Sequence, residues 1–162
     1  MPRRMPTETM GDKAVFQPSS SPDDSIGYLS RYAYRAFVRA LAERLVPHGI
    51  ATGEWSALRV LWAEEGLSQV ELAQRMRIEK ASLTNILSNM QKKGLIIRRG
   101  DSADRRKVNI SLTTRGRKMK DKLLPYGADI NATATKGMST VEVAQLRRLM
   151  GTLIKNLEQA SG

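Results

Sequence analysis

A change of hydrophobic period at Gly94 constrains the fold of this chain more than any other feature. Before this glycine, Leu83, Leu87 and Met90 are spaced as the buried face of a helix. After it, apolar and polar residues alternate over 107–112, as in a strand with one buried face. A glycine between the two patterns can end a helix. The sequence therefore predicts a helical segment that leads directly into a small β-hairpin.

The helical segment divides into two short helices. Ser68 and Glu71 have the spacing of a capping box, which predicts the start of the first helix. A turn at residues 77–78 separates it from a second helix over about 80–92. Two short helices followed by a hairpin are the layout of a winged helix-turn-helix, with the hairpin as the wing.

Further helix is predicted on the N-terminal side. Residues 1–22 lack periodicity and are expected to form a disordered arm. Residues 23–46 carry apolar side chains on one helical face, and Asp23, Asp24 or Ser25 can cap this helix.

On the C-terminal side, residues 113–160 are predicted to hold two helices. The first begins at Thr113 or Thr114, ends near residue 134 and is expected to bend at Pro125. The second has a capping box that starts at Ser139. We therefore expect a mainly α fold with a small β-hairpin wing: a winged helix-turn-helix over 52–112 between helical regions.

Positive charge is concentrated in the predicted winged helix-turn-helix. The 162 residues contain 27 Lys and Arg against 16 Asp and Glu, a formal charge of +11. Residues 66–124 hold 15 of these bases and only 5 of the acids. A regional surplus of this size favours a polyanionic partner, and its place on a helix-turn-helix favours double-stranded DNA over a membrane surface.

Residue types that are scarce exclude several other functions. Cysteine is absent and His48 is the single histidine. Disulfides, thiol redox sensing and a cysteine metal site are therefore excluded, and we expect no metal and no cofactor. Catalysis by a nucleophile and a histidine base is disfavoured, so an enzyme is not expected. Without an apolar run of about 20 residues or an apolar secretion signal, we expect a cytoplasmic protein with no membrane partner.

The helix over 80–92 has the side chains of a DNA-reading helix. Its outward positions are small or carry amides and hydroxyls, which can approach base edges closely and pair with them. An ordinary polar surface helix is the alternative for this segment alone. These outward residues are Ala81, Ser82, Thr84, Asn85, Ser88 and Asn89.

The predicted wing tip is basic. Arg105, Arg106 and Lys107 can meet the negative potential of the minor groove. Asp104 is expected to orient a neighbouring arginine by a charge-assisted hydrogen bond. Alternatively, Asp104 serves only the local hydrogen bonds of a turn.

Two stretches of the chain resemble the MarR family of bacterial transcriptional regulators. The wing and the helix start that follows it, DSADRRKVNISLTTRG over 101–116, are similar to the corresponding part of that family. The stretch LSQVELAQRMRIEKASLTNILSNMQKKGLIIRR over 67–99 is similar to its helix-turn-helix. The resemblance covers roughly residues 25–158.

This resemblance implies a homodimer, built from the helices at 23–46 and 113–160, that binds a pseudo-palindromic operator. Half-sites of such dimers lie about 10 bp apart. It places either Arg105 or Arg106 in the minor groove, and the start of the helix at Ser68 and Gln69 near a phosphate. The full set of expected DNA contacts is Ser68, Gln69, Lys80, Ser82, Thr84, Asn85, Ser88, Asn89, Arg98, Asp104, Arg105, Arg106 and Lys107.

The resemblance also implies a small-molecule effector. An aromatic carboxylate or its CoA thioester is expected to release a repressor from DNA, and the alternative is an architectural or constitutive DNA-binding protein without an effector. The two tryptophans also fit a hydrophobic core, and His48 could be exposed in a turn. The candidate effector-binding residues are Tyr28, Tyr32, His48, Trp55, Arg59 and Trp62.

Overall fold

A computed structural model describes residues 21–104 and 106–161 of the chain. The chain divides into two compact units between Ala36 and Phe37. Arg105 and most of the predicted arm, residues 1–20, lie outside the described residues. No helix in the described ranges is long and apolar enough to cross a membrane.

The first unit contains the 3₁₀ helix η1 (Pro22–Asp24) and the beginning of helix α1 (Ile26–Leu45). The prediction that the arm extends to Pro22 is wrong, because Pro22 opens η1 with the fixed φ that suits a first helical turn. Ser25, one of the three candidate caps, accepts a hydrogen bond at its Oγ from the Tyr28 N–H, at 3.2 Å. The rings of Tyr28 and Tyr32 lie 5.0 Å apart, one helical turn from each other.

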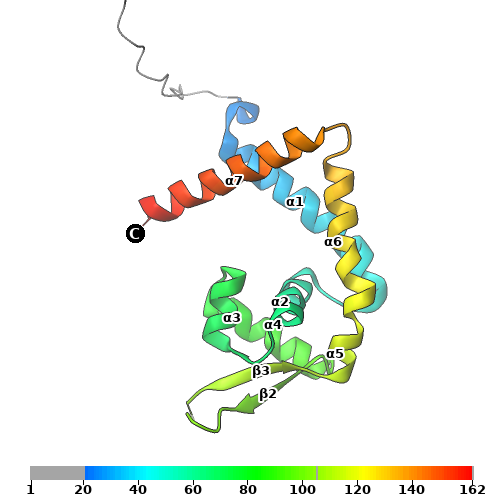
Figure 1. Ribbon diagram of the computed structural model, residues 1–162, viewed down its shortest axis with the longest axis vertical. Helices are drawn as coiled ribbons and strands as arrows, with labels where there is room; N and C mark the ends of the chain where they lie inside the picture. Colours follow the sequence, from blue (N-terminus) through cyan, green and yellow to red (C-terminus); the bar gives the residue numbers. More distant parts are fainter. Residues whose placement is uncertain (1–20, 105, 162) are drawn as a thin grey trace, which may run out of the picture. The chain divides into compact units, whose positions relative to one another are not determined.

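The second unit holds the rest of α1 and the remaining elements (Figure 1). They are η2 (Val46–His48), α2 (Thr52–Ala63), β1 (Leu67–Ser68), α3 (Gln69–Met76), α4 (Lys80–Lys92), β2 (Ile96–Gly100), β3 (Val108–Leu112), α5 (Thr114–Lys118), α6 (Lys120–Ala134) and α7 (Thr140–Ala160). The capping boxes predicted at Ser68 and Ser139 are both present. Gly94 follows α4 with a φ of +66°, a left-handed backbone that stops a helix at little cost to glycine.

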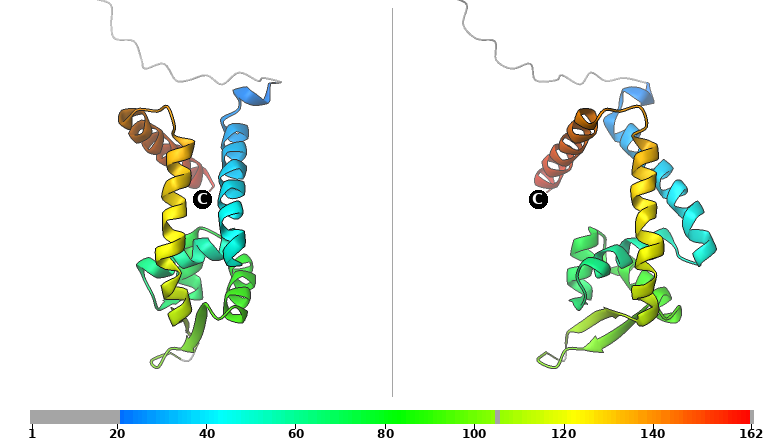
Figure 2. Two further views of the ribbon diagram at one scale, coloured as in Figure 1. Left: turned by 90° about the vertical axis from the view of Figure 1, so that its right-hand side faces the viewer. Right: turned by 45° about the vertical axis from the view of Figure 1, so that its right-hand side comes forward.

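The sheet has three antiparallel strands in the order β1-β3-β2, one more than the predicted hairpin. In the hairpin, Ile96 pairs with Leu112 at the base and Gly100 with Val108 toward the tip. Strand β1 adds two pairs to β3 at its other edge. A strand of two residues is too short to show alternation, which explains why the sequence pattern did not reveal β1. The longer strands of the hairpin are seen at the bottom of both views in Figure 2.

The core lies between α2, α3, α4 and the sheet, and leucine supplies most of it. Burying one such side chain stabilises the folded state by about 1.5–3 kcal/mol. The largest fully buried side chains are Leu45, Leu58, Leu61, Leu72, Leu83, Leu87, Met90, Leu95, Ile96, Ile110 and Leu123.

The long helix predicted after the hairpin is interrupted, but not at the expected residue. It divides at Met119 into α5 and α6, where the Met119 carbonyl accepts hydrogen bonds from the N–H groups of both Lys122 and Leu123. Pro125 lies inside α6. Its missing N–H would have served the carbonyl of Asp121, an exposed residue of the first turn whose carbonyl water can reach.

Candidate nucleic-acid interface

The starts of α3 and α4 are joined by a side-chain hydrogen bond between two predicted DNA contacts. Gln69 Nε2 donates to Thr84 Oγ1 at 2.7 Å, and that hydroxyl donates its own hydrogen to the Lys80 carbonyl at 3.0 Å. Gln69 keeps a carbonyl oxygen and a second N–H for another partner. The two helices therefore present one connected polar surface.

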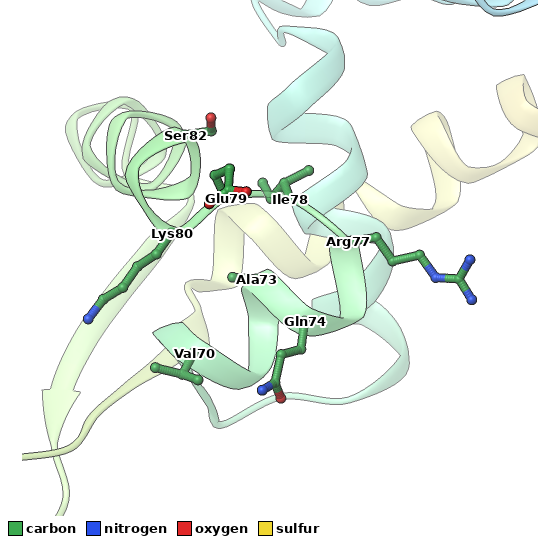
Figure 3. A pocket seen from close by; sticks show the side chains of 8 residues that line it. All are labelled: Val70, Ala73, Gln74, Arg77, Ile78, Glu79, Lys80 and Ser82. Carbon is green, nitrogen blue, oxygen red and sulfur yellow. The ribbon is translucent and has the colours of Figure 1, made fainter. Parts of the chain in front are cut away.

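Helix α4 turns its predicted reading face to solvent. Leu83, Leu87 and Met90 are buried, while the opposite side is exposed except for Ser88, which is half-buried. The Lys80 side chain extends outward beside a depression between α3 and the start of α4 (Figure 3). The exposed predicted contacts on α4 are Lys80, Ser82, Thr84, Asn85 and Asn89.

The wing loop is organised by Asp101, a residue that sequence reasoning treated only as part of a polar loop. Its Oδ1 accepts hydrogen bonds from the N–H groups of Ala103, at 2.7 Å, and Asp104, at 3.1 Å. Its Oδ2 accepts from Asn109 Nδ2 at 3.1 Å. These bonds, led by that from Ala103, hold the pKa of Asp101 below its ordinary value. An aspartate two residues before a small residue in a loop is the signal for such a turn.

Asp104 takes part in the local hydrogen bonds of the wing turn, one of the two roles predicted for it, while orientation of a neighbouring arginine stays a prediction because Arg105 lies outside the described residues. Its Oδ1 accepts a hydrogen bond from the backbone N–H of Arg106 at 3.0 Å. Among the described residues, no ion pair joins Asp104 to a guanidinium. Asp104 therefore shapes the turn that carries Arg106, and the predicted orientation of Arg106 through its side chain is not observed.

The winged region matches known proteins. Residues 50–108 match the model of the MarR family. The HTH-type transcriptional regulator TtmR of Methylorubrum extorquens is 32% identical over 135 residues, covering 82% of this chain and 66% of TtmR. The organic hydroperoxide resistance transcriptional regulator of Bacillus subtilis is 30% identical over 106 residues, covering 65% of this chain and 71% of that regulator. The chain belongs to the MarR family. It spans about two thirds of the length of these curated relatives.

The fold of this MarR-family chain agrees with that of solved relatives. The MepR–DNA complex of Staphylococcus aureus contains a chain with a TM-score of 0.77 and 25% identity, covering 82% of this chain and 98% of MepR. The family model matches only residues 50–108, whereas the MepR structure matches 82% of the chain. The structural agreement therefore extends into the helices that flank the winged region.

The LT-x-x-G sequence on which the MarR resemblance partly rests has a structural explanation here. Thr113 caps α5, accepting from the Gly116 N–H at 3.1 Å and donating to the Gly94 carbonyl at 2.6 Å. A Cβ at Gly116 would overlap the Leu95 carbonyl oxygen. Glycine thus allows α5 to pack directly against the backbone at the base of the wing.

Some of the described bases form ion pairs with glutamates of the same chain. Glu65, for example, receives both Nε and Nη2 of Arg117, at 2.8 and 2.7 Å, and this bond lowers the pKa of Glu65. In the described ranges, by contrast, no ion pair engages Lys80, Arg106 or Lys107. The paired bases are Arg75 with Glu64, Arg77 with Glu158, Lys93 with Glu54, and Arg117 with Glu65.

Arg98 differs from the other predicted DNA contacts. It pairs with Ile110 in the sheet, so both side chains stand on the core-facing side. Its side chain is half-buried, and its Nε is buried without a hydrogen-bond partner among the described residues. The base of the wing, rather than an open surface, holds this arginine.

Most candidate effector residues in the second unit lie in the core or in internal contacts. Trp55 is 6% exposed and donates its indole N–H to the Leu123 carbonyl, while Trp62 donates to the Gly116 carbonyl. Trp55 thus lies in the core that the apolar helical stripe predicted, and the half-buried Trp62 packs against that core. Arg59 lies over the Trp55 ring, 4.9 Å from its centre, and His48 Nε2 lies 2.9 Å from the Tyr126 hydroxyl. His48 is therefore half-buried rather than free in a turn.

Proposed function

We propose that this chain is a homodimeric transcriptional repressor that reads a pseudo-palindromic DNA operator. Helix α4 would enter the major groove and the wing the adjacent minor groove. The observation that carries the proposal is the exposed polar face of α4, together with the wing bases Arg106 and Lys107, which form no ion pair with a described acid. The MepR–DNA complex supports it as a relative of the same fold bound to DNA.

The dimer is supported by α7. This helix has 21 residues, each of them at least partly exposed, although large apolar side chains follow one another along it. A face of this kind is typical of a helix that packs against a partner. We propose a second copy of the chain as that partner, because the operator symmetry of the family requires two reading lobes. Its exposed apolar residues are Val141, Leu146, Leu149, Met150, Ile154 and Leu157.

The DNA-binding proposal is tested by selecting duplexes from random-sequence DNA with the wild-type protein and then measuring the affinities of variants. Arg106→Ala should weaken binding to selected and nonspecific DNA alike and reduce the salt slope by about one. Asn85→Ala should cost about 1–3 kcal/mol at one base position only. The control is Lys136→Ala. It also removes one positive charge, but from the segment between α6 and α7. Selection of no sequence would overturn the proposal.

For the effector we propose a small aromatic carboxylate or its CoA thioester. Arg44, one helical turn before His48, has a buried Nη1 without a hydrogen-bond partner among the described residues. A carboxylate would satisfy such a nitrogen. Benzoate- and cinnamate-type acids and their CoA thioesters should raise the melting temperature and release the selected duplex. If none of them does so, the chain is a constitutive DNA-binding protein.

A further inference from the structure

Lys93 belongs to the most basic part of the chain, but its charge is turned inward. Its Nζ donates to Glu54 Oε1 and Oε2, at 2.8 and 2.7 Å, and to the Gly49 carbonyl at 2.8 Å. All three N–H groups of the ammonium thus have acceptors within the chain. A lysine held in this way has no donor left for a DNA phosphate.

Glu54 is the buried member of this cluster, with only 2% of its surface exposed. Besides Lys93, its Oε2 accepts the backbone N–H of Ala51 at 2.9 Å, at the start of α2. Removal of the cation from a buried ion pair strongly destabilises the folded protein, because it leaves the carboxylate charge buried without a partner. Glu54 and Lys93, which are 39 residues apart in sequence, therefore depend on each other.

The cluster joins the end of α4 to the turn before α2. Lys93 caps the C-terminus of α4, while Gly49, Ala51 and Glu54 span that turn and the first turn of α2. On the other side of the turn, His48 is hydrogen bonded to Tyr126 of α6. The turn is thus attached both to α4, the helix that would read DNA, and to α6.

From these contacts we infer that Glu54 and Lys93 form a clamp that sets the position of α4, so that both residues determine operator affinity without touching DNA. The inference rests on the proposed DNA-binding function. It assigns a positioning role to a lysine whose place in the sequence suggests a phosphate contact, and to a glutamate whose charge would repel DNA.

The test uses full-length Glu54→Gln and Lys93→Met, with Lys92→Met as the matched control. Lys92 is the adjacent residue, and it is exposed and makes no ion pair within the described chain. Affinities are measured for a duplex selected by the wild-type protein and for poly(dI-dC), over a range of salt concentrations. All measurements are made at a temperature where circular dichroism shows each variant to be folded.

Glu54→Gln and Lys93→Met should each lower the affinity for the selected duplex about tenfold, a usual size for coupling between sites, and leave the salt slope unchanged. Lys92→Met should leave the ratio of selected to nonspecific affinity unchanged. The double variant should lose no more than either single variant, because both changes remove one clamp. Should a single variant fail to fold, the double variant, which leaves no buried charge unpaired, must show the tenfold loss.

A phosphate contact predicts different results. Lys93→Met would then weaken binding to both DNAs equally and reduce the salt slope, and Glu54→Gln would strengthen binding because it removes a negative charge. Either result would overturn the clamp. So would additive losses in the double variant, or an unchanged ratio of selected to nonspecific affinity in folded variants. A wild-type protein that binds DNA but selects no sequence would instead contradict the proposed function.

Discussion

The winged lobe, from α2 to α5, and the C-terminal helix α7 differ in how far their apolar side chains are buried. The lobe buries its leucines against one another and ties its surface helices together with ion pairs and caps. Helix α7 has a complete capping box at its start, yet every one of its residues stays at least partly exposed. The lobe thus buries its apolar residues within one chain, whereas α7 leaves an apolar face exposed, which we propose is covered by a second chain.

This difference separates two kinds of stability. Folding of the lobe depends on contacts inside one chain and is independent of protein concentration. Packing of the α7 face onto another copy is an association, and its contribution rises with concentration. The following substitutions distinguish the two, in order of expected effect.

Gly116→Ala should have the largest effect, because the added Cβ would overlap the Leu95 carbonyl oxygen and force α5 away from the wing. We expect a loss of about 3 kcal/mol in the free energy of unfolding, the upper end for overpacking, measured by urea denaturation. Gly151→Ala in α7 is the control, since its Cβ meets no atom of the described residues within 4 Å. An equal loss at Gly151 would break the contrast between the two regions.

Leu149→Glu should act on association. Leu149 is 54% exposed in the single chain, and burial of a leucine contributes about 1.5–3 kcal/mol. We expect the dimer dissociation constant to rise about 10- to 100-fold, measured by sedimentation equilibrium. Arg148→Glu, at the neighbouring exposed position, should change it much less. A dimer that tolerates both changes would show that the partner packs elsewhere.

Glu65→Gln should have the smallest effect and should depend on pH. The folded pKa of Glu65 lies below the ordinary value of 4.5, so its bond to Arg117 contributes stability above that pH and loses it as the pH falls through the folded pKa. Because the pair is exposed, we expect the free energy of unfolding of the wild type to exceed that of the variant by only about 0.5–1 kcal/mol at pH 7. Denaturation curves at a series of pH values from 7 downward should show this gap narrowing below pH 4.5. A gap of constant size over the whole series would assign it to packing instead.

Local patterns in the sequence predicted the elements of this fold well. The capping boxes at Ser68 and Ser139, the stop at Gly94 and the alternation over 107–112 all depend on residues a few positions apart, and all are present in the structure. The same reasoning placed the outward face of α4 correctly except at Ser88, which is half-buried, because helical period fixes which side chains share a face.

Contacts between distant residues could not be predicted in this way. Lys93 and Arg117 were counted among the bases of a DNA-binding region, yet each is paired with a glutamate 39 or 52 residues away. Nothing in the local pattern distinguishes them from Arg106. Strand β1 was not predicted for another reason. It has only two residues, too few for a recognisable pattern, and it is a strand only because it pairs with β3.

Ser68 belongs to two elements at once. Its backbone pairs with Asn109 in β3, and its side chain caps α3 by accepting the Glu71 N–H. The residue after it, Gln69, holds Thr84 on α4. The wing strand and both helices are therefore joined through two adjacent residues, Ser68 and Gln69. If α4 and the wing read DNA as proposed, new operator preferences in the descendants of this protein should evolve by exchange of exposed α4 side chains, while the spacing between α4 and the wing stays constant.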